Sequence, residues 1–164
     1  MILLFRVDER LIHGQVVVGW GNELHPDRIV VVDDELADSP WEQELYGFGL
    51  PEHIAASFET VGAAQRHLAG WDAGSARWIV LTRDVETMRR LAEGGRLDGR
   101  EINIGGLHYA PGREAVLPYV YLSQAERSAL EGLTRTGAIA SARDVPGARR
   151  VPAERLLRSG GNGA

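Results

Sequence analysis

The sequence predicts a three-layer α/β/α fold with a mostly parallel central sheet of about six to seven strands. Short runs of β-branched and other apolar residues alternate with segments that have the spacing of helices. These runs are apolar at consecutive positions, which is typical of strands buried on both faces. The chain has 164 residues, 44% of them hydrophobic, which suits one domain. We expect that domain to cover residues 1–158 and a disordered tail to cover residues 159–164.

The first half of the chain is expected to supply three strands, each followed by a helix. His25-Pro26-Asp27 ends the first helix, Ser39-Pro40 offers a capping side chain and a proline to the second, and Gly70 closes the third. The expected strands cover residues 2–7, 28–32 and 53–57, and the expected helices cover residues 14–24, 40–47 and 60–68.

The second half continues the alternation and adds a glycine-rich loop at residues 105–112. Gly94-Gly95 indicates a helix end, and Ser123 with Glu126 forms a capping box that begins a helix ending at Gly137. The expected strands cover residues 77–82, 101–104, 119–122 and 138–145. The helix that ends at Gly94-Gly95 is expected to cover residues 84–93. Ligands of such sheets bind at the carboxyl ends of the strands, so the site is expected in the loops that follow them.

Composition excludes several classes of chemistry. There is no cysteine, and all 18 basic residues are arginine, so disulfides, cysteine nucleophiles, the phosphate-loop lysine and Schiff-base lysines are absent. The net charge of −5 without a basic run argues against a nucleic-acid partner. Arg6 interrupts the apolar start, and no uncharged run approaches the ~18 residues of a membrane span. We therefore expect a cytoplasmic protein.

The loop after the first strand holds the most informative group of residues. His13 precedes Gly14 at the expected start of a helix, where backbone N–H groups favour an anion. Arg10 can offer a two-donor fork to phosphate oxygens, and a neutral histidine in such company can attack phosphorus. The spacing also fits an ordinary histidine at a helix terminus with two surface arginines, and the residues alone leave that alternative open.

The other polar residues fit no familiar site. His25, His53, His67 and His108 lack metal-ligand spacing, so no metal is expected, and no Gly-x-Gly-x-x-Gly follows the first strand. His108, in the glycine loop, is expected either to border the His13 site or to be an ordinary turn residue. We interpret three tryptophans, Trp41, Trp71 and Trp78, as core or interface aromatics.

Three segments resemble one protein family in order and spacing. The segment Arg6-Val-Asp-Glu-Arg-Leu-Ile-His-Gly-Gln-Val resembles the signature of enzyme IIB components of the mannose/fructose/sorbose class of the bacterial phosphoenolpyruvate-dependent sugar phosphotransferase system. Residues 28–38 resemble the second strand and turn of that family, and residues 103–109 with Gly112 resemble its later glycine loop. The resemblance extends over about residues 1–157.

The resemblance implies a phosphohistidine carrier that accepts a phosphoryl group from an enzyme IIA partner and passes it to a sugar during uptake. It implies phosphorylation of His13, at Nδ1, and phosphoryl binding by neighbouring residues, namely Arg10, Gly14, Gln15, Asp8 and Arg6. The roles of Asp8 and Arg6 stay open between ring orientation and a structural ion pair.

The implied partners are enzyme IIA, the membrane permease components IIC and IID, and a hexose or hexosamine, with no cofactor. The protein would then associate peripherally with the permease. Two alternatives remain at this point. One is a regulatory phosphorelay protein of the same family without transport, and the other is a non-catalytic module that binds an anion or small molecule on the same fold.

Overall fold

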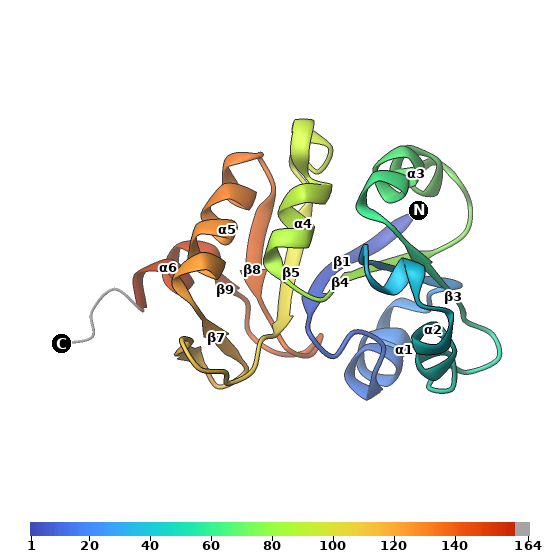
Figure 1. Ribbon diagram of the computed structural model, residues 1–164, viewed down its shortest axis with the longest axis horizontal. Helices are drawn as coiled ribbons and strands as arrows, with labels where there is room; N and C mark the ends of the chain where they lie inside the picture. Colours follow the sequence, from blue (N-terminus) through green and yellow to red (C-terminus); the bar gives the residue numbers. More distant parts are fainter. Residues whose placement is uncertain (160–164) are drawn as a thin grey trace.

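A seven-stranded sheet forms the centre of the molecule in a computed structural model that describes residues 1–159 (Figure 1). Its strand order is β3-β2-β4-β1-β5-β8-β9; neighbouring strands are parallel except β8 and β9. The strands are β1 (Ile2–Asp8), β2 (Arg28–Val32), β3 (Ala55–Glu59), β4 (Trp78–Thr82), β5 (Glu101–Gly106), β8 (Ile139–Ala142) and β9 (Val151–Pro152). The expected mostly parallel α/β sheet is confirmed.

Helices cover the two faces of this sheet unequally. The larger core cluster joins the sheet to α3 (Val61–Ala73), α4 (Val85–Leu91), α5 (Gln124–Arg135) and α6 (Ala153–Ser159). The smaller cluster joins the other face to the π-helix η1 (Gln15–Trp20), which continues into α1 (Gly21–Leu24), and to α2 (Pro40–Gly47). The remaining elements are η2 (Leu36–Asp38), η3 (Glu93–Gly95), and a two-stranded hairpin of β6 (Glu114–Leu117) and β7 (Val120–Leu122).

Alternation of side chains along β1 and β5 separates the core from the polar residues. Phe5 and Val7 of β1 and Ile102 and Ile104 of β5 belong to the larger core cluster. The residues between them, including Arg6, Asp8 and Asn103, therefore face the opposite side of the sheet. This side is apolar under β2 and β4 but polar at the carboxyl ends of β1 and β5, where the first loop begins.

Most expected elements are present, with shifted ends. Helix α3 passes Gly70 and ends at Ala73, because Leu68 and Trp71 still bury against the core. The Ser123–Glu126 capping box is confirmed, whereas the side chain of Ser39 forms no capping hydrogen bond. The third strand covers residues 55–59 instead of 53–57.

The largest miss is near the end of the domain, where no strand or helix was expected after residue 145. Residues 151–159 form β9 and α6, held by the fully buried side chain of Leu156. The expected disordered tail lies outside the described residues except for Ser159, at which α6 ends. Among the helices of residues 1–159, none has the length and hydrophobicity required to cross a bilayer.

Candidate functional site

The site begins with two charged side chains at the end of β1. Arg6 and Asp8 are alternate residues on the polar side of the sheet, and neither side chain is exposed to solvent. Arg6 Nη2 donates to Asp8 Oδ2 over 3.0 Å. Burial lowers the pKa of the Arg6 guanidinium, and the Asp8 carboxylate acts in the opposite direction. A buried pair of this kind is stable only when hydrogen bonds satisfy its remaining donors and acceptors.

Arg6 meets that requirement at Nη1 and Nη2, through residues far away in the sequence, whereas its Nε is buried without a partner among the described residues. Its Nη1 donates to Asn103 Oδ1 and, over 3.0 Å, to the carbonyl oxygen of Arg143. Its Nη2 also donates to the carbonyl oxygen of Asp144 over 3.0 Å. The guanidinium lies over Gly105, where an added Cβ would come within 2.0 Å of Arg6 Cζ. Arg6 therefore ties the loop after β8 to β1 and β5, and only glycine fits beneath it.

Arg10 approaches the same carboxylate from the solvent side. Its Nε lies 3.2 Å from Asp8 Oδ1, and its backbone N–H donates to that oxygen over 3.1 Å. Its Nη2 donates to Gln15 Oε1 over 2.7 Å, and Arg6 Nη2 lies 3.4 Å from the same oxygen. Arg10 keeps 37% of its side chain exposed, so the structure pairs one buried and one accessible guanidinium around Asp8.

His13 follows directly, with its ring between a backbone carbonyl and Asp8. Nδ1 lies 2.8 Å from the carbonyl oxygen of Leu11, and Nε2 lies 3.6 Å from Asp8 Oδ2 without a hydrogen-bond partner among the described residues. Leu11 is fully buried in the left-handed conformation with φ of 57°, which costs a non-glycine residue roughly 1–2 kcal/mol. The chain therefore bears local strain that aims this carbonyl at the ring.

The chain next to His13 is open at Gly14, whereas only 17% of the His13 side chain is exposed. Gly14 is exposed, and no heavy atom lies within 4 Å of the position that a Cβ would take there. Helix η1 begins at Gln15, and in its first turn the backbone N–H groups of Val16 and Val17 donate to the His13 carbonyl over 3.0 and 2.9 Å. An anion can approach Gly14 without displacing a side chain, and the expected grouping of Arg10, His13, Gly14 and Gln15 is present.

The surroundings keep the ring neutral near pH 7. Burial lowers the pKa of His13, the Leu11 carbonyl and Asp8 raise it, and Arg10 and Arg6 lower it, with a net shift downward. A neutral ring retains a lone pair on one nitrogen, which a nucleophile requires. The geometry is therefore compatible with attack of His13 on an electrophilic centre near pH 7.

We expect His13 to titrate below the ordinary histidine pKa of about 6.5 in the folded protein. Between the two pKa values the unfolded chain binds more protons than the folded one, so His13 makes the protein less stable as pH falls below about 6.5. NMR titration of ¹³C-labelled histidines checks this, with the His13→Gln variant assigning the signal and urea-unfolded protein as reference. A folded-state pKa at or above the unfolded value contradicts it.

The glycine loop after β5 is joined to the first loop by Glu9. The backbone N–H of His108 donates to Glu9 Oε1 over 2.6 Å, and Arg113 Nη1 donates to Glu9 Oε2 over 3.0 Å. Arg113 also pairs with Glu126 at the start of α5. His108 is thus near the first loop through its backbone, but no contact joins its side chain to His13, and its Nε2 is buried without a partner among the described residues.

Several residues that complete the site carried no local sequence signal. Trp20 Nε1 donates to the Asp144 carbonyl over 3.0 Å. The Cζ atoms of Arg6 and Arg143 lie over the Trp20 ring, 5.4 and 4.9 Å from its centroid. Asn103 Nδ2 donates to the Arg143 carbonyl over 3.0 Å. Only Asn103 lies in a segment that the family resemblance quoted. Trp20, Arg143 and Asp144 lie outside the segments that carry the resemblance.

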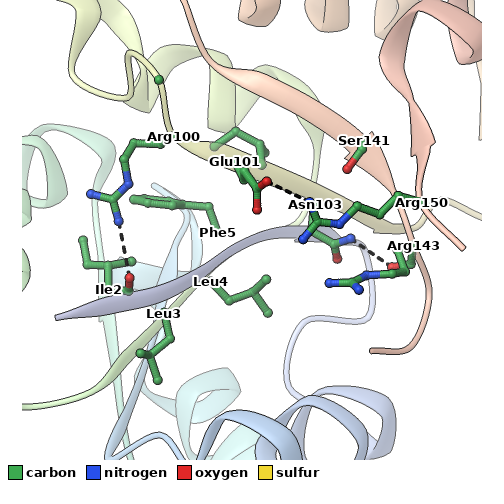
Figure 2. A pocket seen from close by; sticks show the side chains of 12 residues that line it. Ile2, Leu3, Leu4, Phe5, Arg100, Glu101, Asn103, Ser141, Arg143 and Arg150 are labelled. Carbon is green, nitrogen blue, oxygen red and sulfur yellow. Dashed lines mark hydrogen bonds and ion pairs between the residues drawn. The ribbon is translucent and has the colours of Figure 1, made fainter. Parts of the chain in front are cut away.

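A groove of about 290 Å³ on the uncovered part of the sheet is a weaker candidate (Figure 2). It is lined by the first half of β1 and by Glu101, Asn103, Arg143 and Arg150, so most of it lies away from the carboxyl ends of the strands. Arg150 is paired with Glu101 over 2.7 Å. No group of three or more metal-ligating side chains is present in residues 1–159.

Comparison with known proteins connects this geometry to one family. A family model described as the sorbose subfamily IIB component of the PTS system matches residues 2–162. The chain is 32% identical over 154 residues to the N-acetylgalactosamine-specific phosphotransferase enzyme IIB component 1 of Escherichia coli (strain K12). The matched region covers 89% of this chain and 92% of that protein. It is 26% identical over 160 residues to the fructose-specific EIIB component of Bacillus subtilis (strain 168), covering 96% of both.

Solved structures agree with these sequence matches. The crystal structure of the Escherichia coli N-acetylgalactosamine-specific IIB component 1 superposes with a TM-score of 0.82 at 29% identity, covering 92% of this chain and 98% of that one. The IIB domain of the sorbose permease from Klebsiella pneumoniae superposes with a TM-score of 0.85, covering 100% and 98%, at 22% identity. The second comparison supports the fold alone.

Proposed function

Because the chain belongs to the sorbose subfamily of phosphotransferase-system IIB components, we propose that His13 is the residue that carries its phosphoryl group. A IIB component accepts a phosphoryl group from a IIA component and transfers it to a sugar, so the chain is a phosphotransferase. The observation that supports His13 is its position beside Asp8 and Arg10, next to the open space at Gly14. Phosphoryl transfer requires such positioning and charge stabilisation more than covalent chemistry from the protein.

The charges around the ring favour Nδ1 as the reacting nitrogen. A phosphoryl group on Nε2 would lie against the buried Asp8 carboxylate, 3.6 Å from that nitrogen, and like charges at this distance repel. With the group on Nδ1, Nε2–H faces Asp8, which stabilises the positive charge that the ring acquires. Because a carbonyl oxygen only accepts, Nδ1 carries the ring proton that bonds to the Leu11 carbonyl in this structure. That bond must break and the proton must move to Nε2 before Nδ1 can attack, and the bond between phosphorus and the IIA donor breaks as the new bond to Nδ1 forms. ³¹P NMR of the phosphorylated protein distinguishes the two isomers, and a signal from the Nε2 isomer contradicts this assignment.

We assign different tasks to the two arginines. The guanidinium nitrogens of Arg6 bond to Asp8, Asn103 and two backbone carbonyls, so Arg6 positions the site without touching the phosphoryl group. Arg10 is accessible and can exchange its bonds to Asp8 and Gln15 for phosphate oxygens. Its planar fork suits two oxygens at once.

Replacing Arg10 by Lys should therefore slow phosphorylation of the protein about ten- to hundredfold, although the charge is kept. A charged hydrogen bond contributes about 1.5–3 kcal/mol, and a lysine cannot reproduce the two-donor geometry. The measurement is the rate of phosphorylation by a IIA component. Arg135→Lys, on an arginine with 75% of its side chain exposed, is the control. Rates within twofold of wild type for Arg10→Lys contradict a forked contact.

As a IIB component the chain works with IIA and permease partners and a sugar. We propose a hexose or hexosamine as the final acceptor, since the relatives are named for N-acetylgalactosamine, fructose and sorbose. We also propose a cytoplasmic protein that binds the permease from that side. The test is loss of label from the phosphorylated protein when everted vesicles with IIC and IID components receive each sugar in turn. No loss with any of them argues for the regulatory alternative.

A further inference from the structure

Helix α2 presents an apolar face that the rest of the described chain leaves uncovered. Trp41, Leu45 and Phe48, hereafter the α2 patch, are 65%, 57% and 78% exposed. Their spacing of four and three residues places them on one side of the helix and its last turn. Trp41 was interpreted from sequence as a core or interface aromatic, and its exposure excludes the core. Large exposed apolar groups gathered in one place indicate a contact surface for another molecule.

The opposite side of α2 is firmly attached to the domain. Tyr46 packs on the smaller core cluster and lies 6.2 Å from the ring of Phe58, and Gln43 donates to the Leu36 carbonyl over 2.7 Å. A hollow of about 320 Å³ between α2 and Arg83 opens beside Trp41 and Leu45. The α2 patch is therefore held in place and indented, as a docking surface for a protruding side chain requires.

Carboxylates predominate in the segment that carries the α2 patch, and Arg83 is the one cation that lines the hollow beside it. Residues 29–65 contain eight carboxylates and no lysine or arginine. Three of these carboxylates are paired, Asp33 with Arg83, Asp34 with Arg90 and Glu59 with His67. Among the described residues the other five have no ion-pair partner; they are Glu35, Asp38, Glu42, Glu44 and Glu52. The segment that carries the α2 patch therefore has an excess of unpaired negative charge, with Glu42 at the hollow itself.

We propose that the α2 patch docks the basic cytoplasmic loops of the membrane permease, a step that rests on the proposed function. Cytoplasmic loops of membrane proteins carry an excess of Lys and Arg, which complements an apolar patch in an acidic segment. An anionic bilayer surface would instead be repelled by the same segment. The permease is therefore the partner whose chemistry fits.

The α2 patch lies on the same side of the sheet as the His13 loop, so a partner bound there is near the site of transfer. Tyr46 of α2 and Leu11, Ile12 and Val16 of the His13 loop and η1 pack in the same cluster, and Figure 1 shows α2 beside α1. Both the IIA donor and the sugar must reach His13 in line through phosphorus. A second contact outside this shared approach allows the permease to be recognised separately from IIA.

The experiment measures two steps separately: phosphorylation of the protein by IIA, and transfer of the phosphoryl group from the protein to the sugar. The variant Trp41→Gln/Leu45→Gln/Phe48→Gln removes the α2 patch at exposed positions, and Ile139→Gln, on a residue 56% exposed on β8, is the control. We expect phosphorylation by IIA to stay within twofold of wild type in both. We expect sugar-dependent loss of label with IIC- and IID-containing vesicles to fall about tenfold or more in the triple variant alone, since a few buried aromatic anchors dominate such contacts.

A second variant tests the charge. Glu42→Arg/Glu44→Arg should lower the rate of sugar-dependent loss of label in the same way, whereas Glu154→Arg on α6 should leave that rate unchanged. If the rates of both steps fall together, the α2 patch binds IIA or is required for folding, and the proposal is wrong. If neither changes, it has no role in transfer. Weaker binding of the triple variant to protein-free phosphatidylserine vesicles, or conversion of a wild-type dimer to a monomer, also overturns the proposal. Failure of wild type to accept a phosphoryl group overturns the proposed function instead.

Discussion

The His13→Ala variant should accept no phosphoryl group, the largest single effect that the site predicts. His13 alone among the five histidines has both Asp8 and Arg10 beside it at the start of a helix. Without its ring nitrogen no group in the loop can attack phosphorus, because Asp8 is buried between two guanidinium groups. The measurement is incubation with phosphoenolpyruvate, enzyme I, the histidine phosphocarrier and a IIA component, followed by mass spectrometry at alkaline pH.

The matched control for this experiment is His108→Ala. His108 contacts the first loop through its backbone N–H, which an alanine keeps, so this variant should be labelled like wild type. His13→Ala should keep the circular dichroism of wild type, because His13 lies in the loop between β1 and η1 and its ring has one hydrogen bond among the described residues, to the Leu11 carbonyl. Label retained in His13→Ala, or mapped to another histidine, would overturn the assignment of the phosphoryl carrier.

The second large effect is expected for Gly105→Ala. The added methyl group would come within 2.0 Å of Arg6 Cζ, so the guanidinium must leave its place. Asp8 and Asn103 then lose their buried partner, and breaking a buried ion pair costs about 3–5 kcal/mol. The loop that Arg6 ties through the Arg143 and Asp144 carbonyls is also released. We expect both the free energy of unfolding and the phosphorylation rate to fall.

Urea denaturation and the IIA-dependent phosphorylation rate measure these two losses. Gly70→Ala is the control, because Gly70 lies inside α3 and nothing stands within 4 Å of its added Cβ. That substitution should be neutral or stabilise the protein by about 0.5–1 kcal/mol. Equal stability for Gly105→Ala and wild type would show that Arg6 is not confined in the way described.

Features that depend on neighbours along the chain could be predicted from the amino-acid sequence. Alternating apolar runs and helical segments predicted the parallel α/β sheet, and Ser123 with Glu126 predicted a capping box, since strand and helix periods and caps act over a few residues. The segment from Arg6 to Val16 likewise placed the candidate nucleophile and its arginine in one loop. Local chemistry of this kind leaves a pattern in consecutive letters.

The surroundings of that loop became visible only in the folded structure. Arg6 bonds to the carbonyls of Arg143 and Asp144, 137 and 138 residues away, and backbone carbonyls leave no trace in a sequence because every residue has one. The left-handed turn at Leu11 and the exposure of Trp41 are equally invisible in the letters. Both are consequences of which surfaces the folded chain covers, and that depends on packing between elements far apart in the sequence.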